Sequence, residues 1–144
     1  MIPIVPNSFG DIVTAAQLAL AIYQSLSDSR GAPYELNCFV KELRSFADAL
    51  LLLFKIVGEI GLPLTGPVAE DIISEAETCL DFVKGVREGI EPYETAFARG
   101  RGSLRKVWYK ICWGVFKPKE IMMLRTKVSQ RTQNIAIWVG SLQV

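Results

Sequence analysis

One long apolar repeat between residues 36 and 57 constrains the fold more than any other feature of the chain. Residues that recur every three or four positions line one face of an α-helix, whereas a strand would need them at every second position. Leu51 and Leu52 widen the stripe, so this helix is expected at the centre of the molecule with neighbours on more than one side. Pro33 is suited to open it, and Gly58, Gly61 and Pro63 are expected to end it. The repeat consists of Leu36, Phe39, Val40, Leu43, Phe46, Ala47, Leu50, Leu53, Phe54 and Val57.

Three further segments carry the same spacing and predict long helices at about 8–28, 65–92 and 119–142. Ser8 is a good N-cap for the first, and Pro67 suits the first turn of the next. Gly85, Gly89 and Pro92 are expected to kink or fray that helix before a tail at 93–98. The expected inward residues are Ile12, Ala15, Ala16, Ala19, Ile22, Tyr23 and Leu26, then Ile72, Ala76, Cys79, Leu80, Val83, Val86 and Ile90, and finally Ile121, Leu124, Val128, Ile135, Trp138 and Leu142.

The stretch from Leu104 to Phe116 predicts one more, shorter helix with apolar residues on both faces. One face carries a regular stripe of Leu104, Val107, Trp108, Ile111, Cys112 and Val115. The other face places Tyr109, Trp113 and Phe116 among Arg105, Lys106 and Lys110. Aromatic residues framed by cations suit an anionic bilayer surface, a partner's groove or a second packing layer.

No strand alternation or hairpin turn interrupts these helical patterns. The sequence therefore predicts an all-α fold, a mostly antiparallel bundle of four long helices plus one short helix. Its 144 residues suit one domain, expected at 8–144 after an N-terminal tail at 1–7.

The net charge of +1 hides a strong separation of charge along the chain. Residues 63–98 hold eight acids against Lys84 and Arg87, whereas residues 99–144 hold ten basic residues against Glu120 alone. Such asymmetry indicates either pairing within the molecule or an anionic partner. We expect a carboxylate partner or a snorkelling conformation for Arg131, which interrupts the last stripe. The acids at 70, 71, 75 and 77 are expected to form a solvated helix face.

The absence of histidine removes most catalytic arrangements from consideration. Without it there is no Ser-His-Asp or Cys-His nucleophile and no imidazole metal ligand. Cys38, Cys79 and Cys112 lack metal-binding spacing and are expected to be buried, reduced thiols. The chain is therefore expected to be neither an enzyme nor a holder of metal or cofactor. Reduced thiols, the lack of a signal-peptide pattern and apolar stretches too short for a membrane span favour a cytoplasmic protein, with peripheral membrane contact left open.

Three stretches carry a resemblance to a family of fungal proteins. They are SFGDIVTAAQLALAIYQSL at 8–26, YELNCFVKELRSFADAL at 34–50 and KVWYKICWGVFKPKEIMMLRTKVSQRTQNI at 106–135. The chain resembles the helical N-terminal domain of fungal STAND (NLR-like) proteins, and the N-terminal region of fungal proteins with a downstream ubiquitin-like domain. The resemblance implies a HeLo-like helical bundle, similar to those of membrane-active cell-death effectors, and a role in cell-death or innate-immune-type signalling.

The same resemblance implies that an N-terminal amphipathic helix and a basic surface take part in signalling, oligomerisation and membrane attack. Two features depart from it. The first predicted helix has Pro3, Pro6 and Asp11 near its start and lacks a GxxxGxxxG glycine zipper, and no phosphate-binding G-x-x-x-x-G-K-[ST] motif occurs. Any NTPase activity is therefore expected outside this chain. The resemblance supplies no catalytic residues.

These observations lead to a non-enzymatic signalling or interaction domain as the predicted function. Its expected partners are another protein, downstream domains of the same protein, an anionic membrane surface or further copies of itself; the near-neutral charge argues against nucleic acid. The alternative is a structural adaptor that binds a protein partner without lipid. The predicted contact residues are Arg105, Lys106, Tyr109, Lys110, Trp113, Phe116, Lys117 and Lys119.

Overall fold

The computed structural model describes the backbone of residues 9–26, 34–63, 65–99 and 117–143, and this part of the chain is entirely helical apart from short turns. It contains α1 (Gly10–Leu26), α2 (Tyr34–Ile60), α3 (Pro67–Arg99) and α5 (Pro118–Leu142). The prediction of an all-α bundle with four long helices is thus confirmed for these residues. The predicted short helix at 104–116 lies outside them.

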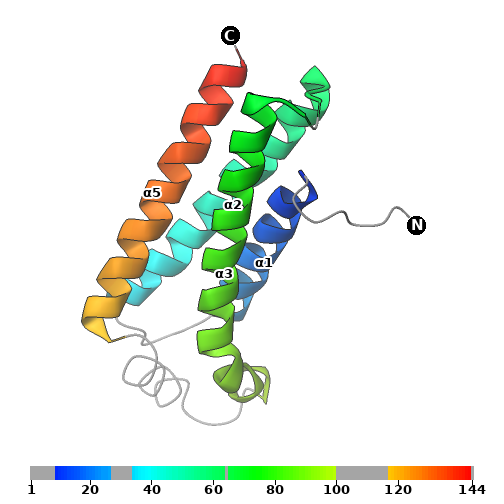
Figure 1. Cartoon of the computed structure of the whole chain (residues 1–144). Helices are drawn as coiled ribbons and strands as arrows, with labels where there is room; N and C mark the ends of the chain where they lie inside the picture. The colour runs from blue at the N-terminus through cyan, green and yellow to red at the C-terminus, as the bar shows by residue number, and fades with distance from the viewer. Residues whose placement is uncertain (1–8, 27–33, 64, 100–116, 144) are drawn as a thin grey trace.

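The four helices form a bundle in which direction alternates along the chain (Figure 1). α1 and α3 run one way, and α2 and α5 run the other way. α1 packs against both α2 and α3, while α2 packs against both α1 and α5. Described helices that follow one another in sequence are therefore antiparallel, as expected, but the packed pairs α1–α3 and α2–α5 are parallel.

The fourth side of the bundle, between α3 and α5, is much less tightly closed. The backbones of these two helices come within 8 Å of each other at next to no position, in contrast to the three packed pairs. The packing order is therefore α3, α1, α2, α5, with the two end members facing each other across a loose junction. We call this junction the α3–α5 seam.

The core contains the apolar stripes that the sequence predicted. Phe39, Phe46, Leu43 and Leu50 of α2 are fully buried, and Phe46 meets Phe82 of α3 edge to face with the ring centroids 6.2 Å apart. Three alanines of α1 are equally buried, which lets the neighbouring helices approach α1 closely. In α5, Ile121, Val128 and Ile135 are buried, whereas Leu124, Trp138 and Leu142 are half-buried.

Leu51, Leu52 and Phe54 are more exposed than the stripe predicted, at 38%, 44% and 40%. Phe54 lies in the last two turns of α2, which extend past the start of α1 (Figure 1), so less of the bundle is there to cover it. The placement of Phe54 in the core was wrong. The prediction of neighbours on more than one side of α2 is confirmed, but Leu51 and Leu52 remain partly exposed.

The ends of the helices follow their local chemistry in two of three cases. Gly61 ends α2 with a positive φ of 63°, and the amides of Gly61 and Leu62 bond back to the carbonyls of Gly58 and Val57, the hydrogen-bond pattern of a Schellman motif. Pro67 begins α3, as expected for a residue with no amide hydrogen. The predicted end of this helix before a tail at 93–98 is wrong, because α3 continues past Pro92 to Arg99.

Candidate interaction surface at the start of α5

Two of the eight predicted contact residues, Lys117 and Lys119, lie in the described part of the chain. Both side chains are exposed at the end of the bundle where α5 begins. The other six predicted residues lie outside the described residues: Arg105, Lys106, Tyr109, Lys110, Trp113 and Phe116.

The local structure at Lys117 and Lys119 gives these charges no role in holding the helix. Lys117 has extended dihedrals, φ −62° and ψ 152°, and its carbonyl accepts the Ile121 amide at 2.9 Å, while Pro118 takes the first helical position. Positive side chains at this end oppose the helix dipole, and Glu120 in the same turn only partly offsets them. Neither lysine forms an ion pair with another residue that the structure describes.

The arginines of α5, in contrast, are engaged within the molecule. Arg125 donates from Nε to Glu42 Oε1 at 2.7 Å and from Nη1 to Glu35 Oε2, two carboxylates seven residues apart on the same side of α2. These hydrogen bonds hold the pKa of the guanidinium above its usual range. The bonds join α5 to its parallel neighbour α2.

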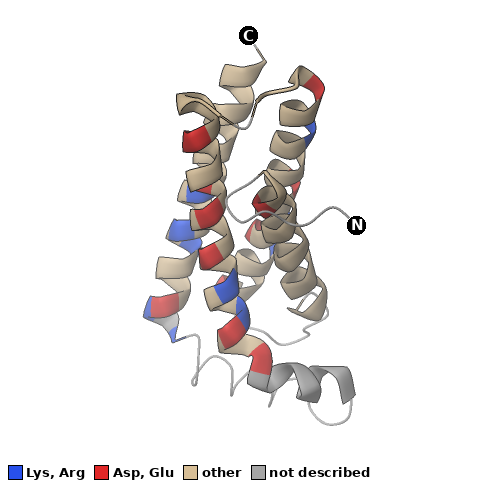
Figure 2. Cartoon of the chain, turned by 45° about the vertical axis from the view of Figure 1, so that its right-hand side comes forward, with Lys and Arg blue, Asp and Glu red and all other residues tan. Residues whose placement is uncertain are grey.

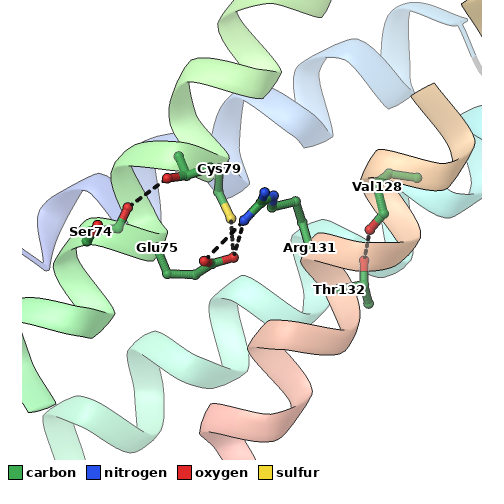
Figure 3. Close-up of polar contacts among 7 residues, drawn as sticks. Ser74, Glu75, Cys79, Val128, Arg131 and Thr132 are labelled. Atoms are coloured by element: carbon green, nitrogen blue, oxygen red, sulfur yellow. Dashed lines mark hydrogen bonds and ion pairs between the residues drawn. The ribbon is translucent and has the colours of Figure 1, made fainter. Parts of the chain in front are cut away.

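Arg131 makes the corresponding contact across the α3–α5 seam (Figure 3). Its Nη1 lies 3.2 Å from both carboxylate oxygens of Glu75, whose side chain is only 16% exposed. The expected carboxylate partner of Arg131 is therefore confirmed. Glu70 and Asp71 are exposed as predicted, but the placement of Glu75 on a solvated face was wrong because it turns into the seam.

Cys79 lies beneath this ion pair and is completely buried. Its thiol is 3.8 Å from Glu75 Oε1, and burial, reinforced by the nearby carboxylate, raises its pKa to about 12. A thiol with that pKa remains protonated near neutral pH and is a poor nucleophile. Cys38 is half-buried rather than fully buried, which corrects the sequence prediction, and Cys112 lies outside the described residues.

A groove of about 400 Å³ opens in the seam between residues 81–89 of α3 and the N-terminal half of α5. Phe82 and Val86 of α3 and Met123 and Leu124 of α5 supply apolar walls, and two glycines on α3 leave the groove wide. Its charged lining residues are Asp81, Glu120 and Lys127. The volume lies near the lower end of the range for small-molecule sites, and the opening is on the same end of α5 as Lys117 and Lys119.

Sequence periodicity gave only indirect signs of this groove. Gly85 and Gly89 lie four residues apart on α3, and Met123 falls just outside the inward stripe of α5. Each feature has an ordinary explanation in one helix. Only the side-by-side placement of two helices separated by a long connection brings these residues together.

Charge is distributed unevenly over the two helices of the seam (Figure 2). Acidic residues recur along α3, and basic residues recur along α5. Because Arg125 and Arg131 are already paired with carboxylates, the positive charge that stays exposed on α5 is that of Lys117, Lys119 and Lys127.

Within the described residues, no group of three or more cysteines and carboxylates is arranged to hold a metal ion. None of the four described helices combines the length and the hydropathy that a membrane crossing requires. Comparisons of the chain with protein-family models, with curated protein sequences and with solved structures find no match.

Proposed function

We propose that this chain is a non-enzymatic signalling or interaction domain that contacts an anionic membrane surface through basic residues at the start of α5. The contact surface comprises Lys117 and Lys119 together with the predicted contact residues that precede them. The HeLo-like assignment belongs to the same proposal and rests on the sequence resemblance alone.

One observation carries the proposal: the bundle uses its α5 arginines internally but leaves the lysines at the start of α5 exposed. Arg125 and Arg131 each neutralise carboxylates of neighbouring helices. Lys117 and Lys119 are exposed to solvent at the N-terminal end of α5, where the helix dipole makes a positive charge unfavourable. Each basic residue held near an anionic bilayer contributes about 1 kcal/mol to binding, so a group of them gives reversible attachment.

Vesicle co-sedimentation tests this function with the full chain. The protein should sediment with vesicles of phosphatidylcholine and phosphatidylserine, but not with vesicles of phosphatidylcholine alone. Lys117→Glu combined with Lys119→Glu should weaken binding to the anionic vesicles by at least about tenfold, because attraction is replaced by repulsion. Added salt should weaken the wild-type interaction, since exposed charges are screened.

The matched control reverses two lysines elsewhere on the bundle. Lys41→Glu with Lys84→Glu changes the net charge by the same amount, and both side chains are exposed, on α2 and α3. This variant should retain most of the binding. Equal binding to both kinds of vesicle, or equal losses in the two double variants, would contradict a specific contact at the start of α5.

The α3–α5 groove favours a second candidate, an adaptor that binds a protein partner without lipid. Met123 is 59% exposed at its edge, and flexible methionine side chains are common on surfaces that accept different partners. Failure of the anionic vesicles to bind the wild-type chain would favour this alternative.

A further inference from the structure

The packing order of the bundle leaves one junction weaker than the others. Among the described helices, the backbone of α3 lies close to that of α1 and the backbone of α5 close to that of α2, so α3 and α5 are the ends of the series α3, α1, α2, α5. Phe82 of α3 also contacts Phe46 of α2. Regions with few close contacts open at lower free energy than the rest of a domain. The α3–α5 seam is therefore the junction with the least packing to lose.

The contacts that do cross the seam differ between its two halves. The half nearer the C-terminal end of α5 is bridged by Arg131 and Glu75. The Arg131 side chain is 28% exposed and the Glu75 side chain is 16% exposed. The other half contains the groove of about 400 Å³, where the walls lack the close packing of a protein interior. Among the ion pairs of the described helices, Glu75–Arg131 is the one that joins α3 to α5.

A buried thiol lies next to this ion pair and can report its opening. Cys79 is 0% exposed, and Figure 3 shows its sulfur next to the Glu75 carboxylate and the Arg131 guanidinium. Reagents that modify thiols can reach the sulfur only if the covering groups move away. Separation of α3 from α5 would uncover it, together with the apolar walls of the groove.

We infer that the bundle opens at the α3–α5 seam before it unfolds as a whole, and that the Glu75–Arg131 pair is the latch that holds the seam closed. The opening exposes apolar surface of α3 and α5 while the α1–α2 pair stays packed. This device is independent of the proposed membrane contact, and either could exist without the other.

Thiol labelling of Cys79 as a function of urea concentration tests the inference. The full chain carries Cys38→Ser and Cys112→Ser, so that Cys79 is its remaining thiol. Below the unfolding transition, the labelling rate should depend on urea much less steeply than global unfolding does, because a partial opening exposes less surface. A labelling rate with the full urea dependence of global unfolding would overturn the inference.

The latch is tested in the same background by Arg131→Gln. Labelling of Cys79 should become about tenfold faster, the change expected when a largely buried carboxylate loses its charged partner. The acceleration cannot come from a more reactive thiol, because Arg131 lowers the pKa of Cys79 and its removal leaves less thiolate. Arg131→Lys keeps the charge, so its labelling rate should lie between the rates of the parent and of Arg131→Gln.

Arg125→Gln provides the control on the same helix. Arg125 also bonds glutamates, but those of α2, away from the seam. Its loss should leave the labelling rate at low urea nearly unchanged. Equal acceleration by Arg125→Gln and Arg131→Gln would show that the latch has no special role, and an unchanged rate in Arg131→Gln would also refute it. If Arg131→Gln does not fold, the urea dependence of labelling in the parent tests the opening of the seam. The labelling rate of Arg131→Lys then tests the latch, and a rate equal to that of the parent would refute it.

Discussion

At the scale of single residues, the chain places its charged groups where they join particular helices. The planar guanidinium of Arg125 reaches two carboxylates of α2, and that of Arg131 faces both oxygens of Glu75 on α3. Arg125 uses two nitrogens of its planar group for two different carboxylates, a geometry that a lysine could not reproduce. The lysines of α5 remain in solvent, which separates the residues that hold the bundle from those available to a partner.

The buried thiol of Cys79 makes a prediction about alkaline pH. Its pKa is raised from an ordinary value of 9.0 to about 12, so the folded chain keeps a proton that the unfolded chain loses in this range. The unfolded state then binds fewer protons, and the free energy of unfolding falls as pH rises, by up to about 1.4 kcal/mol per pH unit from this group. The contribution is complete below the ordinary pKa and is lost towards pH 12.

Urea unfolding of the wild type and of Cys79→Ala under reducing conditions measures this contribution. Lysines and tyrosines titrate in both proteins and cancel in the difference. The stability advantage of the wild type should shrink steadily between about pH 8 and about pH 10.5. A difference that stays constant over this range would show that the thiol is not shielded in the folded state.

At the scale of the elements, α1 and α2 form the central pair, and α2 is the longer of the two. It contacts α1 on one side and α5 on the other, and its inward residues are almost completely buried. Its end at Gly61 and the beginning of α3 at Pro67 both follow from backbone chemistry. Leu51 and Leu52 are partly exposed, so the apolar run of α2 includes residues that do not belong to the core.

Two leucines of α2 allow a matched test of this arrangement. Leu50 is 0% exposed and Leu52 is 44% exposed. Leu50→Ala should lower the free energy of unfolding by about 2–5 kcal/mol, because it leaves a cavity in the core. Leu52→Ala should cost less than about 1 kcal/mol. Urea unfolding followed by circular dichroism measures both, and similar losses would mean that the core of α2 is misplaced.

Sequence periodicity predicted the helices well because each stripe is a local property. The inward residues of α1 followed from spacing, and a carboxylate partner for Arg131 was one of two expected alternatives, without the identity of that carboxylate. Spacing did not predict three features: the burial of Glu75, the exposure of Phe54 and the continuation of α3 past Pro92. Each depends on a neighbouring element or on the whole helix. The α3–α5 groove could not be predicted, since its lining residues on the two helices lie far apart in the sequence, from Gly89 and Glu120 to Asp81 and Lys127.

At the scale of the whole molecule, the bundle is a series of packed helices that closes on itself only loosely. The parallel pairs α1–α3 and α2–α5 are joined through the α1–α2 contact, and within the described residues the seam completes the ring with the Glu75–Arg131 ion pair and a groove. Such an arrangement has a stable centre and two helices that are held from one side. The start of α5, with its exposed lysines, belongs to the less firmly held part.

Amide hydrogen exchange of the full chain, resolved by helix, tests this packing order most directly. The account predicts the slowest exchange in α2, with α1 next, and earlier exchange in the seam-facing parts of α3 and α5. A single common exchange free energy for all four helices, or protection of α3 and α5 equal to that of α2, would contradict it.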